Sequence, residues 1–138
     1  MLKKLFSVLM SLVVLLSCSL TCFALATEDA DIQPYYTNAK SVRTTLSISD
    51  GNASCSAKLT GISGTTTKVT ITMTLEKKIL FWWSEKETWT QTFNSSSGTL
   101  AKTYSGADSG TYRITAEYIA YGSSGSEIIN DTSAEIKA

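Results

Sequence analysis

The side chains that most often carry chemistry in proteins are scarce in this chain. It has 138 residues and no histidine, which excludes Ser-His-Asp and Cys-His catalytic arrangements and imidazole ligands for a metal. Of its three cysteines, Cys18 and Cys22 fall in an apolar N-terminal stretch. The third, Cys55, stands in an alternating strand pattern, where we interpret it as a small buried apolar residue rather than a nucleophile.

Two groups of acidic residues have spacings that could support catalysis or metal binding. Glu85 and Glu87 on one strand would share a face with carboxylates about 6–7 Å apart, near the separations that glycosidases use. Asp29, Asp31 and residues 50–52 could offer oxygens to calcium, but neither stretch supplies the dense ligand set that the ion needs. Charged side chains ordinarily lie on solvent-exposed faces. We therefore expect no catalytic residue, no metal and no cofactor, and a secreted hydrolase ranks last among our functional hypotheses.

An apolar run over residues 79–83 exceeds what a strand can bury. Successive side chains of a strand point to opposite faces, so at least two of these must lie at the surface. We call Phe81, Trp82 and Trp83 the aromatic tip and treat it as the candidate binding site, because exposed aromatic rings tend to dominate binding energies. Trp83 shares the phase of Trp89 and is expected to pack, which leaves Trp82 as the preferred anchor. The alternative, in which the tip only caps one end of the core, stays open.

Alternating apolar and polar residues predict seven short strands that position this tip. They cover residues 42–48, 53–59, 68–76, 85–93, 99–104, 112–120 and 127–137. Asp50-Gly51 is a strong signal for a two-residue hairpin turn, and Ile128, Ala134 and Ile136 are expected to face inward in the last strand. The predicted fold class is all-β, an immunoglobulin-like antiparallel β-sandwich of about seven strands.

The connection into the strand over residues 112–120 carries a structural motif. Asp108-x-Gly110-x-Tyr112 has the spacing of a tyrosine corner, in which a tyrosine hydrogen-bonds to the backbone just upstream. One face of the strand collects its apolar side chains, namely Tyr112, Ile114, Ala116, Tyr118 and Ala120. We therefore expect Tyr112 to fix the corner between the two sheets.

The N-terminal segment has the pattern of a secretory signal peptide. Two lysines near the start precede an almost uninterrupted apolar run over residues 5–23, which ends in Ala24-Leu25-Ala26. A basic region, an apolar core and an A-x-A site are the three parts of such a signal. We assign residues 1–26 to the signal peptide, 27–40 to an extended leader and 41–138 to the domain. A lipoprotein acylated at Cys18 and a retained membrane helix are the alternatives.

Residues 41–138 resemble a family of small, uncharacterised secreted proteins of Gram-positive bacteria. The resemblance rests on Leu46-Ser47-Ile48, Cys55, residues 66–77, the pair Trp83 and Trp89, Thr103-Tyr104 and residues 110–113. It implies a secreted domain of this fold with no established activity. The apolar residues 79–82 depart from the Gly/Ser-rich turn that the family would have there.

Overall composition narrows the class of partner. The chain has 12 basic and 12 acidic residues, so its charge does not point to nucleic acid. We expect a secreted, monomeric, non-enzymatic binding module whose partner is an extracellular protein or glycan. The rival hypothesis is a membrane-active factor that inserts the same aromatic tip into a membrane surface.

We predict that cleavage after Ala26 leaves Thr27 as the first residue of the mature protein, because the site has small residues at Ala24 and Ala26. N-terminal sequencing or intact mass spectrometry measures this directly. A mature chain that begins with an acylated Cys18 would contradict the prediction.

Overall fold

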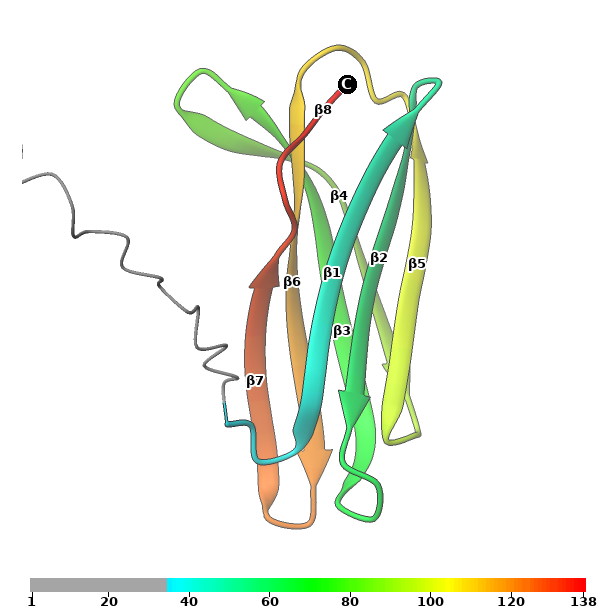
Figure 1. Ribbon diagram of the computed structural model, residues 1–138, viewed down its shortest axis with the longest axis vertical. Coiled ribbons are helices and arrows are strands. Elements are labelled where there is room, and N and C mark those ends of the chain that lie inside the picture. The colour runs from blue at the N-terminus through cyan, green and yellow to red at the C-terminus, as the bar shows by residue number, and fades with distance from the viewer. Residues whose placement is uncertain (1–34) are drawn as a thin grey trace, which may run out of the picture. The chain divides into compact units, whose positions relative to one another are not determined.

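The computed structural model describes residues 35–138, which form two antiparallel β-sheets packed as a sandwich (Figure 1). The strands are β1 (Ala39–Ser49), β2 (Asn52–Gly61), β3 (Thr66–Ile79), β4 (Trp82–Phe93), β5 (Ser97–Ser105), β6 (Thr111–Gly122), β7 (Gly125–Thr132) and β8 (Ile136–Lys137). One sheet has the order β1-β2-β5, and the other has the order β4-β3-β6-β7 with β8 also beside β6. This arrangement confirms the predicted all-β sandwich. In the described part of the chain, no helix is long and apolar enough to cross a membrane.

The core lies between the two inner faces and follows the predicted alternation. From Val69 to Leu75 in β3 and from Tyr112 to Ala120 in β6, every second side chain is buried and its neighbours are not. The largest fully buried side chains are Tyr112, Tyr118, Leu59, Ile71, Met73, Leu75, Leu100, Ile114, Val69 and Cys55. Tyr118 also joins the sheets, because its hydroxyl bonds to the Thr44 hydroxyl at 2.7 Å and donates to the Arg43 carbonyl at 3.1 Å.

The predicted Asp-Gly hairpin turn connects β1 and β2. Asp50 and Gly51 both have positive φ, at 51° and 73°, as a type I′ turn requires. The flanking pair is Ser49 opposite Asn52. The turn therefore has the sequence that its backbone conformation favours.

The connection between β5 and β6 is a tyrosine corner. The Tyr112 hydroxyl lies 3.0 Å from the Asp108 carbonyl oxygen and 2.6 Å from Oδ1 of the same residue, and Lys77 Nζ donates to that carboxylate at 2.7 Å. Gly110 has φ of 151°, and a Cβ there would lie 2.5 Å from Lys77 Cε. A side chain at this position would therefore be strained by the backbone and would displace the end of the Lys77 side chain.

The partners of the Asp108 carboxylate favour its charged form. Hydrogen bonds from Lys77 and then from Tyr112 lower its pKa from 3.8 to about 2. Because the folded-state pKa is the lower one, the contribution to stability is complete above pH 3.8 and is lost as the pH falls through about 2. Burial, followed by the Asp108 hydrogen bond, raises the pKa of Tyr112, so its hydroxyl stays protonated at neutral pH.

In the last predicted strand, Ile128 and Ala134 were expected to face inward but are exposed, whereas Ile136 packs against the core as predicted. Ile129 lies opposite Tyr118 and is buried, whereas Ile128 is 61% exposed. Tyr112 lies opposite Ile136. If the pairing of β6 with β7 continued without a shift, Tyr112 would instead lie opposite Glu135. The extra residue falls where Ser133 exchanges hydrogen bonds with Ile114, and this interruption separates β7 from β8 and changes the phase.

The predicted leader ends earlier than expected. β1 begins at Ala39, and Asn38 is buried, donating from Nδ2 to the carbonyls of Ala120 and Gly125 at 3.3 and 3.0 Å. The Glu127 carboxylate accepts the backbone N–H groups of Thr37 and Asn38 at 2.9 and 2.8 Å. These bonds attach the chain at the β6–β7 turn. The signal peptide, Cys18 and the leader up to residue 34 lie outside the described residues.

Replacement of Tyr112 by Phe should lower the free energy of unfolding by about 1–3 kcal/mol, because it removes the corner hydroxyl and leaves its acceptors unpaired. Urea denaturation measures the change. Tyr35→Phe is the matched control, because Tyr35 is fully solvent-exposed and its hydroxyl should contribute less than about 0.5 kcal/mol. Equal midpoints for the two variants would show that the corner bond contributes nothing.

Candidate functional site

The β3–β4 hairpin extends beyond the sheet to which it belongs. β3 pairs with β6 only as far as Lys77 opposite Tyr112. Beyond that row, Lys78 pairs with Trp83 and Ile79 with Trp82, across the hairpin alone. Figure 1 shows this end of the hairpin at the upper left, projecting away from the sandwich. The aromatic tip is therefore carried on a two-stranded extension.

Three apolar side chains at the end of the hairpin are exposed, and we call Leu80, Phe81 and Trp82 the apex. Leu80 is 75%, Phe81 95% and Trp82 55% exposed. The sequence prediction that at least two of these side chains reach the surface is confirmed. Leu80 was not among the residues that we selected, although its place in the same apolar run marked it.

The turn at the apex has an unfavourable backbone conformation. Leu80 has φ of 55°, while Phe81 has no positive φ. A positive φ at the first central residue alone is the pattern of a type II′ turn, where glycine is preferred. A leucine held in this region is destabilised by about 1 kcal/mol or more because its Cβ crowds the backbone.

The two tryptophans that we expected on one face lie on opposite faces. Leu75 is opposite Glu87, but Glu76 is opposite Glu85, so β4 carries one inserted residue, Lys86. Trp89 lies opposite buried Met73 and packs against the core. On the other side of Lys86, nearer the turn, Trp83 lies opposite Lys78 on the outer face. The expectation that Trp83 shares the phase of Trp89 is wrong because a β-bulge reverses the alternation.

Trp83 is half-buried against cations on the outer face of the sheet. The Arg113 guanidinium carbon lies 4.1 Å from the centroid of the Trp83 ring, and Lys78 Nζ lies 5.6 Å from it. Arg113 Nε also donates to the Glu76 carboxylate at 2.6 Å. This stack supports the base of the apex through a cation–π contact and a charge-assisted hydrogen bond.

The same bulge separates the two carboxylates that we considered for catalysis. Glu85 is aligned with Glu76 and Glu87 with Leu75, so consecutive rows place them on opposite faces of β4. The shared face that the glycosidase hypothesis required is absent. Within residues 35–138, no group of three or more His, Cys, Asp or Glu side chains is placed to hold a metal ion.

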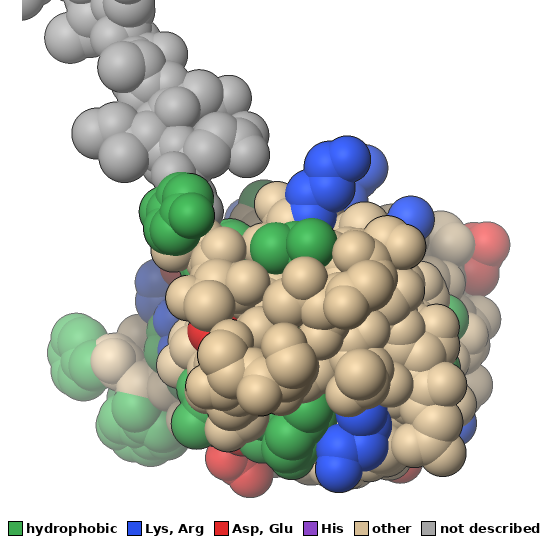
Figure 2. Space-filling model, turned by 90° about the horizontal axis from the view of Figure 1, so that it is seen from below, with side chains coloured by type: hydrophobic (Ala, Val, Ile, Leu, Met, Phe, Trp, Pro, Cys, Tyr) green, Lys and Arg blue, Asp and Glu red, His purple; other side chains and the backbone are tan. Residues whose placement is uncertain are grey.

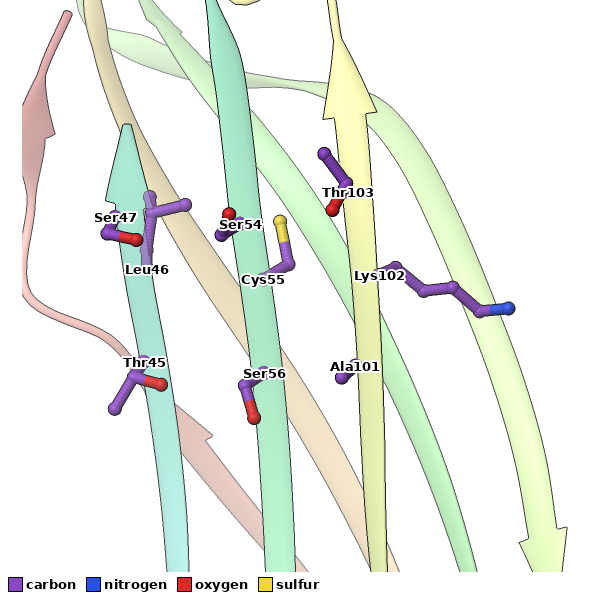
Figure 3. Close-up of a pocket in the computed structure, with 9 residues that line it drawn as sticks. All are labelled: Thr45, Leu46, Ser47, Ser54, Cys55, Ser56, Ala101, Lys102 and Thr103. Carbon is purple, nitrogen blue, oxygen red and sulfur yellow. The ribbon is translucent and has the colours of Figure 1, made fainter. Parts of the chain in front are cut away.

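A shallow depression of about 530 Å³ lies on the three-stranded sheet. Figure 3 shows the residues that line it, on three neighbouring strands: Thr45, Leu46, Ser47, Ser54, Cys55, Ser56, Ala101, Lys102 and Thr103. Its floor offers hydroxyls and one ammonium group that extends away from the others in Figure 3. No carboxylate lines it, so it holds no acid–base pair.

Cys55 is buried on the inner side of β2, as the sequence predicts. Burial, with a smaller effect of the Glu87 charge, raises its pKa from 9.0 to about 11. The thiolate is the reactive form of cysteine. At neutral pH this side chain is therefore a thiol with the packing role of a small apolar group.

Comparisons with known proteins give a distant structural likeness. No family model matches the sequence, and no curated protein matches it. Among solved structures, wild-type OgpA from Akkermansia muciniphila is similar in two crystal forms, with TM-scores of 0.42 and 0.40 and sequence identities of 11% and 12%. The likeness covers 75% and 71% of this chain but only 31% and 29% of OgpA. The chain thus corresponds to about a third of that protein's length.

Trp83→Ala should lower the free energy of unfolding by about 1–2 kcal/mol, the sum of a lost cation–π contact and partial burial. Trp82→Ala should change it by less than about 0.5 kcal/mol, because most of this side chain is already in solvent. Chemical denaturation monitored by circular dichroism compares the two. A larger loss for Trp82→Ala would show that Trp82, and not Trp83, supports the hairpin.

Proposed function

We propose that this protein is a secreted, non-enzymatic binding module and that the apex is its contact site. The observation that carries the proposal is the combination of strain and exposure at Leu80 and Phe81. A tight turn gains nothing for folding from a leucine at positive φ or from a phenylalanine in water. Such a turn is explained if these side chains are buried against something else.

A second hairpin of the same chain shows which residues a tight turn ordinarily uses. Its β1–β2 hairpin needs positive φ at two turn residues and uses Asp50 and Gly51, which accept this conformation at low cost. The β3–β4 hairpin needs it at one residue and uses Leu80 instead. The resemblance to small secreted proteins of Gram-positive bacteria supports the same inference, because a Gly/Ser-rich turn is expected at this place.

The side chains of the chain support binding rather than catalysis. No histidine occurs in the sequence, the Cys55 pKa is raised to about 11, and Glu85 and Glu87 lie on opposite faces. Aromatic and large aliphatic side chains, by contrast, give much contact area for few rotatable bonds. The apex therefore offers binding energy without a reactive group.

The double substitution Leu80→Gly, Phe81→Asn tests the proposal, because it should separate stability from binding. It restores a residue suited to positive φ, so the free energy of unfolding should rise by about 1 kcal/mol. The same variant should lose retention on intact Gram-positive cells, measured by pelleting the cells and assaying the protein that remains in solution.

The matched control is Ile128→Asn, which removes an exposed apolar side chain from β7 and leaves the apex intact. This control should be retained on cells like the unmodified protein. Retention of the double variant at the level of the control would place the contact site elsewhere. A fall in its stability would contradict the assignment of strain to Leu80.

A further inference from the structure

We infer that the partner of the apex is a lipid bilayer, which Leu80, Phe81 and Trp82 enter while Lys78 meets the lipid phosphates. This inference rests on the proposed function and names the chemical class of its partner. It is carried by the shape of the hairpin end, by the order of side chains along it and by the charge nearest to it.

The apex lies at the end of a hairpin that projects beyond its sheet (Figure 1). The last rows, Lys78 with Trp83 and Ile79 with Trp82, have no neighbouring strand. A projecting apolar end needs a partner with a matching deep pocket, or a medium that deforms around it. The hydrocarbon boundary of a bilayer is such a medium, and it accepts Trp, Phe and Leu side chains without shape complementarity.

A glycan would need an aromatic ring that is both exposed and held in position as a platform. Trp83 is held, but Arg113 covers its ring at 4.1 Å. Phe81 is exposed at the turn, where 95% of its surface is free. Neither of these two rings combines the two properties. Trp82 is 55% exposed but lies beside exposed Leu80 and Phe81, which favours partition of the apex as a whole over stacking on a sugar.

The order of side chains along the hairpin matches the order of layers in a membrane interface. From the turn inward, the rows are Ile79 with Trp82, Lys78 with Trp83, Lys77 with Ser84, and Glu76 with Glu85. Apolar groups come first, then an aromatic ring with a lysine, and carboxylates only after them. The lysine row stands about 7 Å behind the turn at about 3.3 Å per residue, within the depth of about 5–10 Å that interfacial segments reach.

Lys78 is the cation best placed to meet an anionic headgroup. Lys77 is engaged by Asp108 at 2.7 Å and Arg113 by Glu76 at 2.6 Å. Lys78 Nζ is 3.9 Å from the nearest carboxylate, Glu135, the loosest of these three ion pairs. Glu135 therefore competes weakly with a phosphate for Lys78, and its removal should strengthen the attraction.

Among residues 35–138, no other segment carries a comparable cluster of exposed large apolar side chains. Figure 2 shows the molecule from below, where polar side chains and backbone predominate and apolar side chains appear in separate patches. Among the described residues, the other exposed large apolar side chains are Tyr35, Ile62 and Ile128, each on a different segment. Binding to a bilayer should therefore depend on the apex and not on general surface hydrophobicity.

Co-sedimentation with vesicles tests the inference, with phosphatidylcholine alone and phosphatidylcholine mixed with phosphatidylglycerol as the two probes. The unmodified protein should pellet with both and more strongly with the mixture. Phe81→Ala should lower partition into either vesicle about tenfold or more, as loss of a buried aromatic group does. Ile128→Ala, which removes an exposed apolar side chain from β7, should partition like the unmodified protein.

Two further variants test the charge. Lys78→Glu should lower, and Glu135→Gln should raise, binding to the mixed vesicles, with little change on phosphatidylcholine alone. These differences should shrink as salt is added. Absence of partition into both vesicles, or equal loss in Phe81→Ala and Ile128→Ala, overturns the inference. If apex-dependent retention on cells persists in that case, the proposed function stands with a protein or glycan partner, and a glycan array identifies the second of these.

Discussion

The hydrogen bond from the Tyr112 hydroxyl to the Asp108 carbonyl fixes the end of the sandwich on which the hairpin is mounted. The same aspartate receives Lys77, which stands in the last row where β3 still pairs with β6. One residue thus holds the connection into β6 and the root of the hairpin. Because this root is fixed, the two-stranded extension beyond it can carry a strained turn and exposed rings without loosening the core.

The fold could be predicted because its strongest signals are local. Alternation in β3 and β6 gave the inner faces correctly, since a one-residue slip would have placed charged side chains in the core. Asp50-Gly51 and the spacing of Tyr112 from Asp108 identified a turn and a corner, each of which has a sequence pattern tied to its backbone conformation. The buried side chains of β3 and β6 and the positive φ angles of Asp50 and Gly51 agree with these predictions.

The errors share one physical cause, which is a single residue inserted into an edge region of a sheet. Lys86 lies among charged and polar residues, and the polar residues of β7 fit either face, so neither stretch has an apolar pattern that reveals its phase. Asn38 was missed for a different reason. Its role depends on carbonyls at Ala120 and Gly125, far along the chain, and a lone asparagine before a strand has no local signature.

Because of the bulge at Lys86, the number of residues between Trp83 and Trp89 decides whether the two side chains share a face of the hairpin. A gene that gains or loses one codon in this stretch would reverse the faces of Trp82 and Trp83 relative to that of Trp89. A change of two codons would restore the original faces. Chain length at this point, more than the identity of any one residue, is therefore the variable through which evolution can convert an outward-directed aromatic group into one directed at the core.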